Sequence, residues 1–164
     1  MANECGLCRG AEMDEELGRV QVWEDELWRL TTSIGPGNPT IASSYLEPKR
    51  HIAYLPDLDG AEAATFGSAL ARCSAALRAV TGVEFVYIYI FGGTPHLHVH
   101  LAPHREGDAL NTSVIKGELV LETFSSGVIG FMSKEYSGLP EDELEAAATA
   151  LRAELNGFHS LPLS

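Results

Sequence analysis

The chain has 164 residues, 45% hydrophobic and 21% charged, which is the composition of a globular protein and predicts a single domain over residues 1–164. Its formal net charge of −12 argues against long DNA or RNA as a partner, because affinity for those polymers depends on neutralising phosphates, while a small phosphorylated ligand in a local pocket stays compatible. The sequence lacks the roughly 20 consecutive apolar residues of a membrane span, and its acidic start does not resemble a signal peptide, so we expect no membrane association and a cytoplasmic location.

The first third of the chain contains a cysteine pair and three predicted strands. Cys5 and Cys8 form a short knuckle, and the acidic residues 12–16 predict a solvated helix face. Residues 20–23 and 27–31 predict two strands, because β-branched and aromatic residues gather there around an acidic turn. A loop rich in Gly and Pro follows at residues 33–40, and residues 41–46 predict a third strand.

The middle of the chain predicts a long helix followed by two strands. Residues 61–80 carry apolar side chains at helical spacing, and Gly82 ends the helix. Residues 83–91 are almost all β-branched or aromatic, so we expect both faces of this strand to be covered and the strand to be central in the sheet. A tight turn at residues 92–95 then leads into an antiparallel strand at residues 96–101.

The last third gives a weaker pattern until its final helix. Residues 119–121 and 128–132 are either short strands or irregular core segments. Pro140 opens a helix over about residues 140–155, with acidic residues in its first turn and an apolar stripe of Leu144, Ala148, Leu151 and Leu155. The predicted fold class is α+β: an antiparallel β-sheet with one long helix packed on it and a C-terminal helix.

Three alternating histidines carry the strongest chemical signal. Because residues two apart in a strand share a face, His96, His98 and His100 point one way while the apolar residues between them point into the core. Such a row suits a metal site, where imidazoles converge on one ion. It also suits phosphoryl chemistry, where one imidazole attacks phosphorus and its neighbours donate to the phosphoryl oxygens. A merely polar outer face of the sheet is the third interpretation.

The spacing Cys5-x-x-Cys8 is half of a structural zinc site or a redox pair. The redox interpretation is the weaker one, since no strand precedes the pair. Zinc needs four ligands, and Cys73 lies in the apolar stripe of the long helix, so histidines would have to complete the site.

These motifs together resemble those of the histidine triad (HIT) superfamily. His96-Leu-His98-Val-His100-Leu-Ala102 matches the family signature His-φ-His-φ-His-φ-φ, in which φ is apolar, at every position. The segments Trp23-Glu-Asp-Glu-Leu27 and Pro48-Lys-Arg-His51 resemble earlier family motifs and stand in the family's order. The resemblance covers about residues 5–108 and implies a HIT-like fold, with residues 109–164 as a C-terminal extension.

The resemblance also implies roles for individual residues. His98 would be the nucleophile that forms a covalent nucleotidyl intermediate, and His100 would help in catalysis and hold the phosphate together with Gly92, Gly93, Thr94 and His104. In the family's zinc-containing subset, a structural Zn²⁺ is bound at the positions of Cys5, Cys8, His51 and His96. The implied function is that of a hydrolase or nucleotidyltransferase acting on a phosphoramidate or phosphoanhydride bond of a small nucleotide, with a homodimer built on the long helix and the strand after it.

The sequence departs from the family pattern in the loop before the third strand. Many members have an acidic residue there that holds ribose, whereas residues 33–38 contain no carboxylate and offer only Asn38. Two alternative functions stay open: a non-catalytic nucleotide-binding module, and a metal-dependent enzyme that uses all three histidines as ligands.

Overall fold

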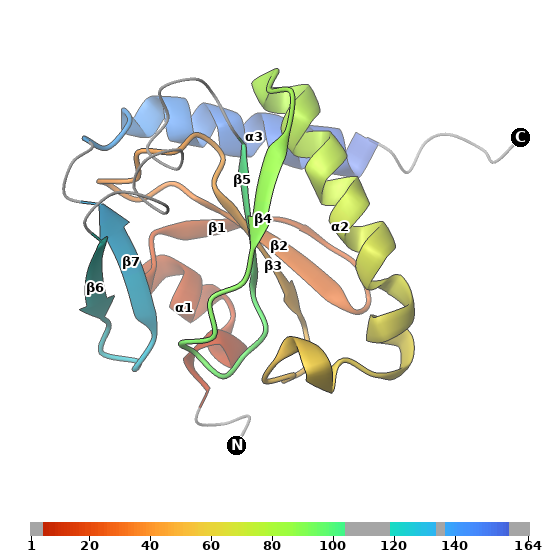
Figure 1. The fold of residues 1–164 in the computed structure, drawn as a ribbon. Helices are drawn as coiled ribbons and strands as arrows, with labels where there is room; N and C mark the ends of the chain where they lie inside the picture. Colours follow the sequence, from red (N-terminus) through yellow and green to blue (C-terminus); the bar gives the residue numbers. More distant parts are fainter. Residues whose placement is uncertain (1–4, 104–118, 134–136, 158–164) are drawn as a thin grey trace, which may run out of the picture.

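The computed structural model describes residues 5–103, 119–133 and 137–157. Five antiparallel strands form the main sheet in the order β1-β2-β3-β5-β4 (Figure 1). Their bounds are β1 (Arg19–Glu24), β2 (Trp28–Ser33), β3 (Ser44–Pro48), β4 (Val86–Tyr89) and β5 (Val99–Pro103). A separate hairpin is made by β6 (Leu119–Thr123) and β7 (Ile129–Ser133). The helices are η2 (Gly6–Arg9), α1 (Ala11–Glu16), η3 (Leu55–Asp57), α2 (Gly60–Thr81) and α3 (Glu141–Gly157).

The predicted α+β class, with a long helix and a C-terminal helix on an antiparallel sheet, is confirmed. The alternation of side chains gives the sheet an apolar face, where Leu30, Leu46 and Leu101 are buried in one core with residues of α2 and α3. Gly82 ends α2 in the left-handed conformation, with φ of 72°. The predicted stripe of α3 is buried in the same core.

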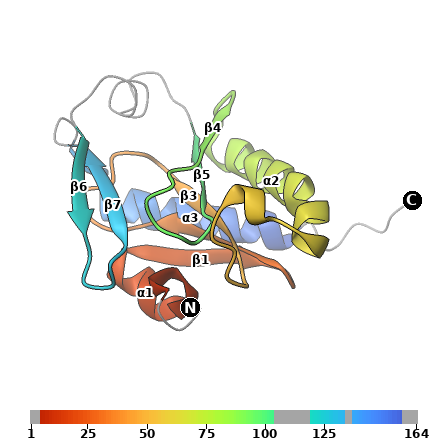
Figure 2. The same cartoon turned by 60° about the horizontal axis from the view of Figure 1, so that its bottom comes forward.

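The opposite face of the sheet carries polar side chains and is covered at one end by the N-terminal segment. Figure 2 shows α1 on one side of β1 and α3 on the other. A second, smaller core is made by Cys5, Leu7, Met13 and Val128, which ties the N-terminal segment to the turn between β6 and β7. None of the described helices is long and apolar enough to cross a membrane.

The expectation that residues 83–91 form a central strand is wrong. Only Val86–Tyr89 is a strand, and β4 lies at the edge of the sheet, because β5 inserts between it and β3. Three apolar residues in or next to β4 stay exposed: Phe85 at 44%, Ile88 at 47% and Ile90 at 39%. Burial within this chain therefore does not explain why both faces of this strand are apolar.

The connection between the last two strands of the sheet also differs from the expected short hairpin. It runs over residues 90–98, so His96 and His98 precede β5 and only His100 lies within the strand. The Leu97 amide donates to the Ile52 carbonyl at 2.7 Å, which holds this segment against the chain after β3. Leu97 and Val99 still point into the core, as the alternation predicts.

Candidate metal centre and histidine face

Four side chains from three parts of the chain meet beside the N-terminal knuckle. Cys5 precedes η2 and Cys8 lies within it, His51 follows β3, and His96 lies in the connection before β5. One ligand atom from each residue lies within 4.8 Å of the other three. The structure thus brings together the four residues that the family resemblance implies as metal ligands.

The distances within this cluster suit tetrahedral coordination. Cys8 Sγ lies 3.3 Å from His96 Nδ1 and 3.5 Å from His51 Nδ1, and Cys5 Sγ lies 3.4 Å from His96 Nδ1. A tetrahedral zinc ion with ordinary Zn–S and Zn–N bonds separates sulfur from nitrogen by about 3.6 Å. Two thiols and two imidazoles also form a set of four ligands that zinc commonly takes in closed, structural sites.

His96 has a hydrogen bond that orients it as a ligand. Its Nε2 donates to the Pro48 carbonyl at 3.2 Å, which leaves the Nδ1 lone pair directed at the cysteines. Burial is the main cause that lowers the pKa of His96, so the ring is neutral near pH 7, as metal binding requires. Burial, followed by the hydrogen bond and charge of Cys5, raises the pKa of the Cys8 thiol to about 11. A bound cation would oppose this shift by favouring the thiolate.

His98 is oriented by the backbone of His96. Its Nδ1 lies 2.7 Å from the His96 carbonyl oxygen, which can only accept a hydrogen bond, so Nδ1 carries the proton. In the neutral ring this leaves the lone pair on Nε2. The side chain is partly exposed, and its ring centroid lies 5.2 Å from that of His100. The geometry therefore presents a nucleophilic nitrogen beside a second imidazole.

His100 is enclosed by three aromatic rings, one from β3 and two from β4 or the residues just after it. Tyr89 stacks on it at 4.7 Å, while Tyr45 and Phe91 meet it edge to face at 5.0 and 5.2 Å. Burial, followed by the charges of His98 and Arg19, lowers the pKa of His100 to about 3. Its Nε2 is buried and has no hydrogen-bond partner among the described residues. His100 is thus neutral near pH 7 and keeps hydrogen-bonding capacity.

A buried cluster of four charged residues on this polar face was not predicted. Arg29 and Arg19 both bond to Asp14, and Arg19 Nη1 also bonds to Glu47 at 3.0 Å. All four side chains are almost fully buried, so the expectation that residues 12–16 form a solvated helix face is wrong for Asp14. Arg19, Arg29 and Glu47 lie one each on β1, β2 and β3, and a single sequence reveals neither the pairing of these strands nor that α1 covers their polar face.

The remaining predicted site residues are only partly placed. Gly92 and Gly93 form an exposed turn ahead of the histidines, while Thr94 is buried and its carbonyl accepts from the His96 amide at 2.8 Å. His104 lies outside the described residues. Asn38 is committed locally, because its side chain both donates to and accepts from the backbone of Thr40. It is therefore a poor substitute for the missing carboxylate.

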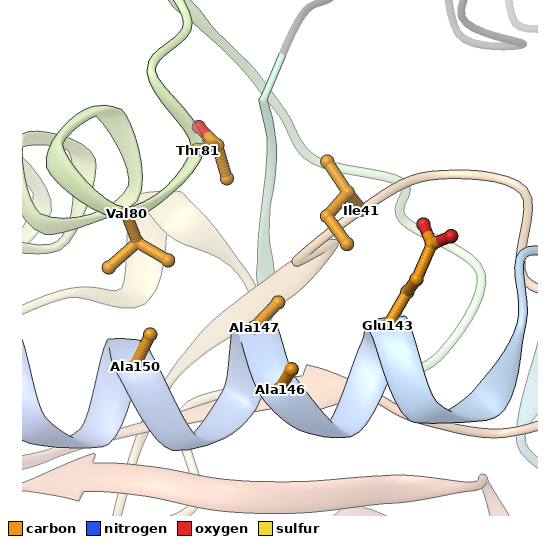
Figure 3. Close-up of a pocket in the computed structure, with 7 residues that line it drawn as sticks. All are labelled: Ile41, Val80, Thr81, Glu143, Ala146, Ala147 and Ala150. Carbon is orange, nitrogen blue, oxygen red and sulfur yellow. The ribbon is translucent and has the colours of Figure 1, made fainter.

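A hollow of about 360 Å³ lies on the helix side of the molecule, away from these residues (Figure 3). Ile41, Val80 and Thr81 line it together with three alanines of α3. Among the described residues that line it, Glu143 is the only charged one, and none is a histidine or a cysteine. Its lining offers little for catalysis, so the histidine face is the better candidate site.

Comparison with known proteins relates the chain to others only through its fold. No family model and no curated protein matches it. A Zn-bound histidine triad family protein from Mycobacterium smegmatis superposes with a TM-score of 0.62 at 22% identity, over 98% of this chain and 99% of the other. A histidine triad protein from Bradyrhizobium japonicum gives 0.65 at 20% identity, over 88% and 95%. A hypothetical histidine triad nucleotide-binding protein from Sulfolobus tokodaii gives 0.62 at 18%, over 94% and 93%. The structure of this chain therefore confirms the resemblance inferred from its motifs, and its fold is that of the histidine triad proteins.

Proposed function

We propose that this protein is a hydrolase or nucleotidyltransferase that cleaves a phosphoramidate or phosphoanhydride bond of a small nucleotide through His98. The observation that carries the proposal is the 2.7 Å hydrogen bond between His98 Nδ1 and the His96 carbonyl. This bond fixes the tautomer in which Nε2 is unprotonated, and only that tautomer of a neutral imidazole can attack phosphorus from Nε2.

The reaction has two displacements. His98 Nε2 forms a bond to phosphorus as the bond to the leaving group breaks, and the leaving group departs with the electron pair and takes up a proton. Water or another acceptor then attacks the nucleotidyl-imidazole and loses its proton, and the bond between phosphorus and His98 breaks. The neutral His100 ring and the backbone amides of residues 92–94 would donate to the phosphoryl oxygens as negative charge develops there. His104 is proposed as a further phosphate contact on the resemblance alone.

We assign Cys5, Cys8, His51 and His96 as the ligands of a structural zinc ion. The sulfur–nitrogen distances of 3.3 to 3.5 Å support this assignment, and so does the similarity in fold to the Zn-bound protein from Mycobacterium smegmatis. With four protein ligands the ion would have no open position for substrate. It would instead brace the segment from which His98 projects.

The two alternatives are less well supported. A metal-dependent enzyme that uses all three histidines requires them on one ion, but His96 Nδ1 faces both cysteines. The group of possible metal ligands within the described ranges contains neither His98 nor His100. A non-catalytic nucleotide-binding module has no observation in its favour beyond the missing loop carboxylate.

The protein is also proposed to form a homodimer through β4. An edge strand presents unpaired backbone groups, and exposed Phe85, Ile88 and Ile90 add apolar surface next to them. Pairing of two β4 strands would explain why this strand is apolar although it lies at the edge of its own sheet. Within the chain, the packing of α3 on both α2 and β1 supports a single domain.

The nucleophile is tested by trapping its intermediate. The wild-type protein, loaded with zinc, is mixed with adenosine 5′-phosphoramidate or a diadenosine polyphosphate, quenched and analysed by mass spectrometry after digestion. An adenylyl group on His98 is expected, and His98→Asn should lose both the adduct and turnover while unfolding at an unchanged temperature. Full turnover by a folded His98→Asn variant would refute the mechanism, and binding without any adduct in the wild type would favour the non-catalytic alternative.

A further inference from the structure

A line of contacts joins the buried charged cluster to His100. Arg19 is held from two sides, because its Nη1 donates to Glu47 at 3.0 Å and its Nη2 donates to Asp14 at 3.4 Å. Its side chain is 5% exposed, and the two acids are just as deeply buried. A guanidinium bonded in this way has a fixed position and a fixed plane.

Tyr45 lies between this guanidinium and His100. The Arg19 guanidinium carbon sits 4.8 Å from the centroid of the Tyr45 ring, within the range of a cation–π contact. The Tyr45 ring meets His100 at 5.0 Å with an angle of 71° between the ring planes, and the Tyr45 hydroxyl lies 3.3 Å from Ser33 Oγ. Tyr45 and His100 are also directly paired across β3 and β5.

We propose that Tyr45, supported by Arg19, is a positioning residue that holds the His100 ring in its orientation beside His98. The part of this inference that concerns catalysis rests on the proposed function. Tyr89 stacks on the face of His100 at 4.7 Å, which fixes the plane of that ring but still permits it to slide. Edge contacts from Tyr45 and from Phe91 oppose that sliding.

The chemistry explains why an aromatic ring is suited to this position. A hydrogen-bonding or charged neighbour would occupy a ring nitrogen of His100 or change its protonation, whereas a ring edge restrains the imidazole and leaves Nε2 without a hydrogen-bond partner among the described residues. The titratable and charged groups that face this assembly are His98 and Arg19, and Arg19 is already paired with its two carboxylates. Tyr45 thus keeps the positive charge of Arg19 from direct contact with His100.

The test compares Tyr45→Phe with Tyr45→Leu in the zinc-loaded full chain. Phe retains the ring and Leu removes it, so turnover of adenosine 5′-phosphoramidate by the Phe variant should stay within about threefold of wild type. The Leu variant should lose roughly 10- to 100-fold in kcat, with KM changed less than about threefold, because misplacement of a catalytic group by about 1 Å costs this much. Phe66→Leu is the matched control, since it removes a ring that packs on Trp28 on the other side of the sheet, and it should keep wild-type kcat.

A second measurement reads the position of His100 without any turnover. In crystal structures, the wild type and Tyr45→Phe should keep the 56° angle between the His98 and His100 rings, and Tyr45→Leu should not. If the wild type forms no adduct, the proposed function fails, but these structures still decide whether Tyr45 sets the ring. An unchanged kcat and ring angle in a folded Tyr45→Leu variant would overturn the inference, as would an equal loss of kcat in Phe66→Leu. Tyr45→Met replaces Tyr45→Leu if the latter does not fold.

Discussion

The pKa of His100 predicts how the stability of the protein depends on pH. Burial, then the charges of His98 and Arg19, lower that pKa from 6.5 to about 3 in the folded protein. The unfolded chain therefore binds more protons than the folded one between these two values, and the free energy of unfolding falls as the pH is lowered through this window. Above pH 6.5 His100 is mostly unprotonated in both the folded and the unfolded chain, so its titration no longer lowers the free energy of unfolding. Integration of the two titrations gives a loss of about 2 kcal/mol at pH 5 and about 3 kcal/mol at pH 4.

This loss is isolated by comparing the wild type with His100→Asn in urea unfolding experiments from about pH 4 to about pH 8. Asn does not titrate, so the difference in unfolding free energy between the two proteins should change by these amounts across the range. Contributions from the metal ligands cancel in that difference, provided that both proteins are measured with a chelator present. A difference that stays constant over the whole range would mean that His100 titrates normally in the folded protein, and the enclosed, neutral imidazole described above would be wrong.

Three further outcomes are expected. Gly18→Ala should lower the free energy of unfolding in urea by at least about 1 kcal/mol, because φ is +62° and the added Cβ would lie 2.9 Å from the Gly35 Cα. Gly67→Ala on the exposed face of α2 should instead raise it by up to about 1 kcal/mol. Equal effects of the two substitutions would contradict the backbone geometry. Ile88→Lys should shift the protein from dimer to monomer in size-exclusion chromatography with light scattering, and a wild type that is already monomeric would refute the β4 interface. Chelation of zinc should increase amide exchange in the turn at residues 124–128, which packs on the knuckle, and exchange unchanged by the chelator would remove the metal from this role.

The sequence was most informative where one side-chain pattern has one structural solution. Apolar residues at helical spacing predicted a helix over residues 61–80. The observed helix spans Gly60–Thr81, with Gly82 at its end. The alternation around the histidines correctly placed Leu97 and Val99 in the core. The spacing of the two cysteines indicated half of a metal site, but the histidines that complete the cluster came from the family resemblance, since nothing in the local sequence connects His51 with His96.

The sequence was misleading where a pattern has more than one physical cause. The apolar run at residues 83–91 indicates a strand with two apolar faces. It does not indicate whether those faces pack against this chain or against another one. The acidic run at residues 12–16 suggests solvation because free carboxylates are normally hydrated. Asp14 is buried instead, because Arg19 from β1 and Arg29 from β2 form ion pairs with it. Only the pairing of those strands in the structure reveals this.

One residue connects the candidate metal centre with the candidate nucleophile. The ring of His96 faces Cys5 and Cys8, and its Nε2 is held by the Pro48 carbonyl, while its own carbonyl accepts the hydrogen bond from His98 Nδ1. The position of that carbonyl determines which nitrogen of His98 is protonated. In the proposed arrangement, a metal that holds the His96 ring would also help to hold the carbonyl that sets the tautomer of His98. Three histidines that look equivalent in the sequence thus lie in three different surroundings, and the separate roles proposed for them follow from the hydrogen-bond partner or set of rings that each of them meets.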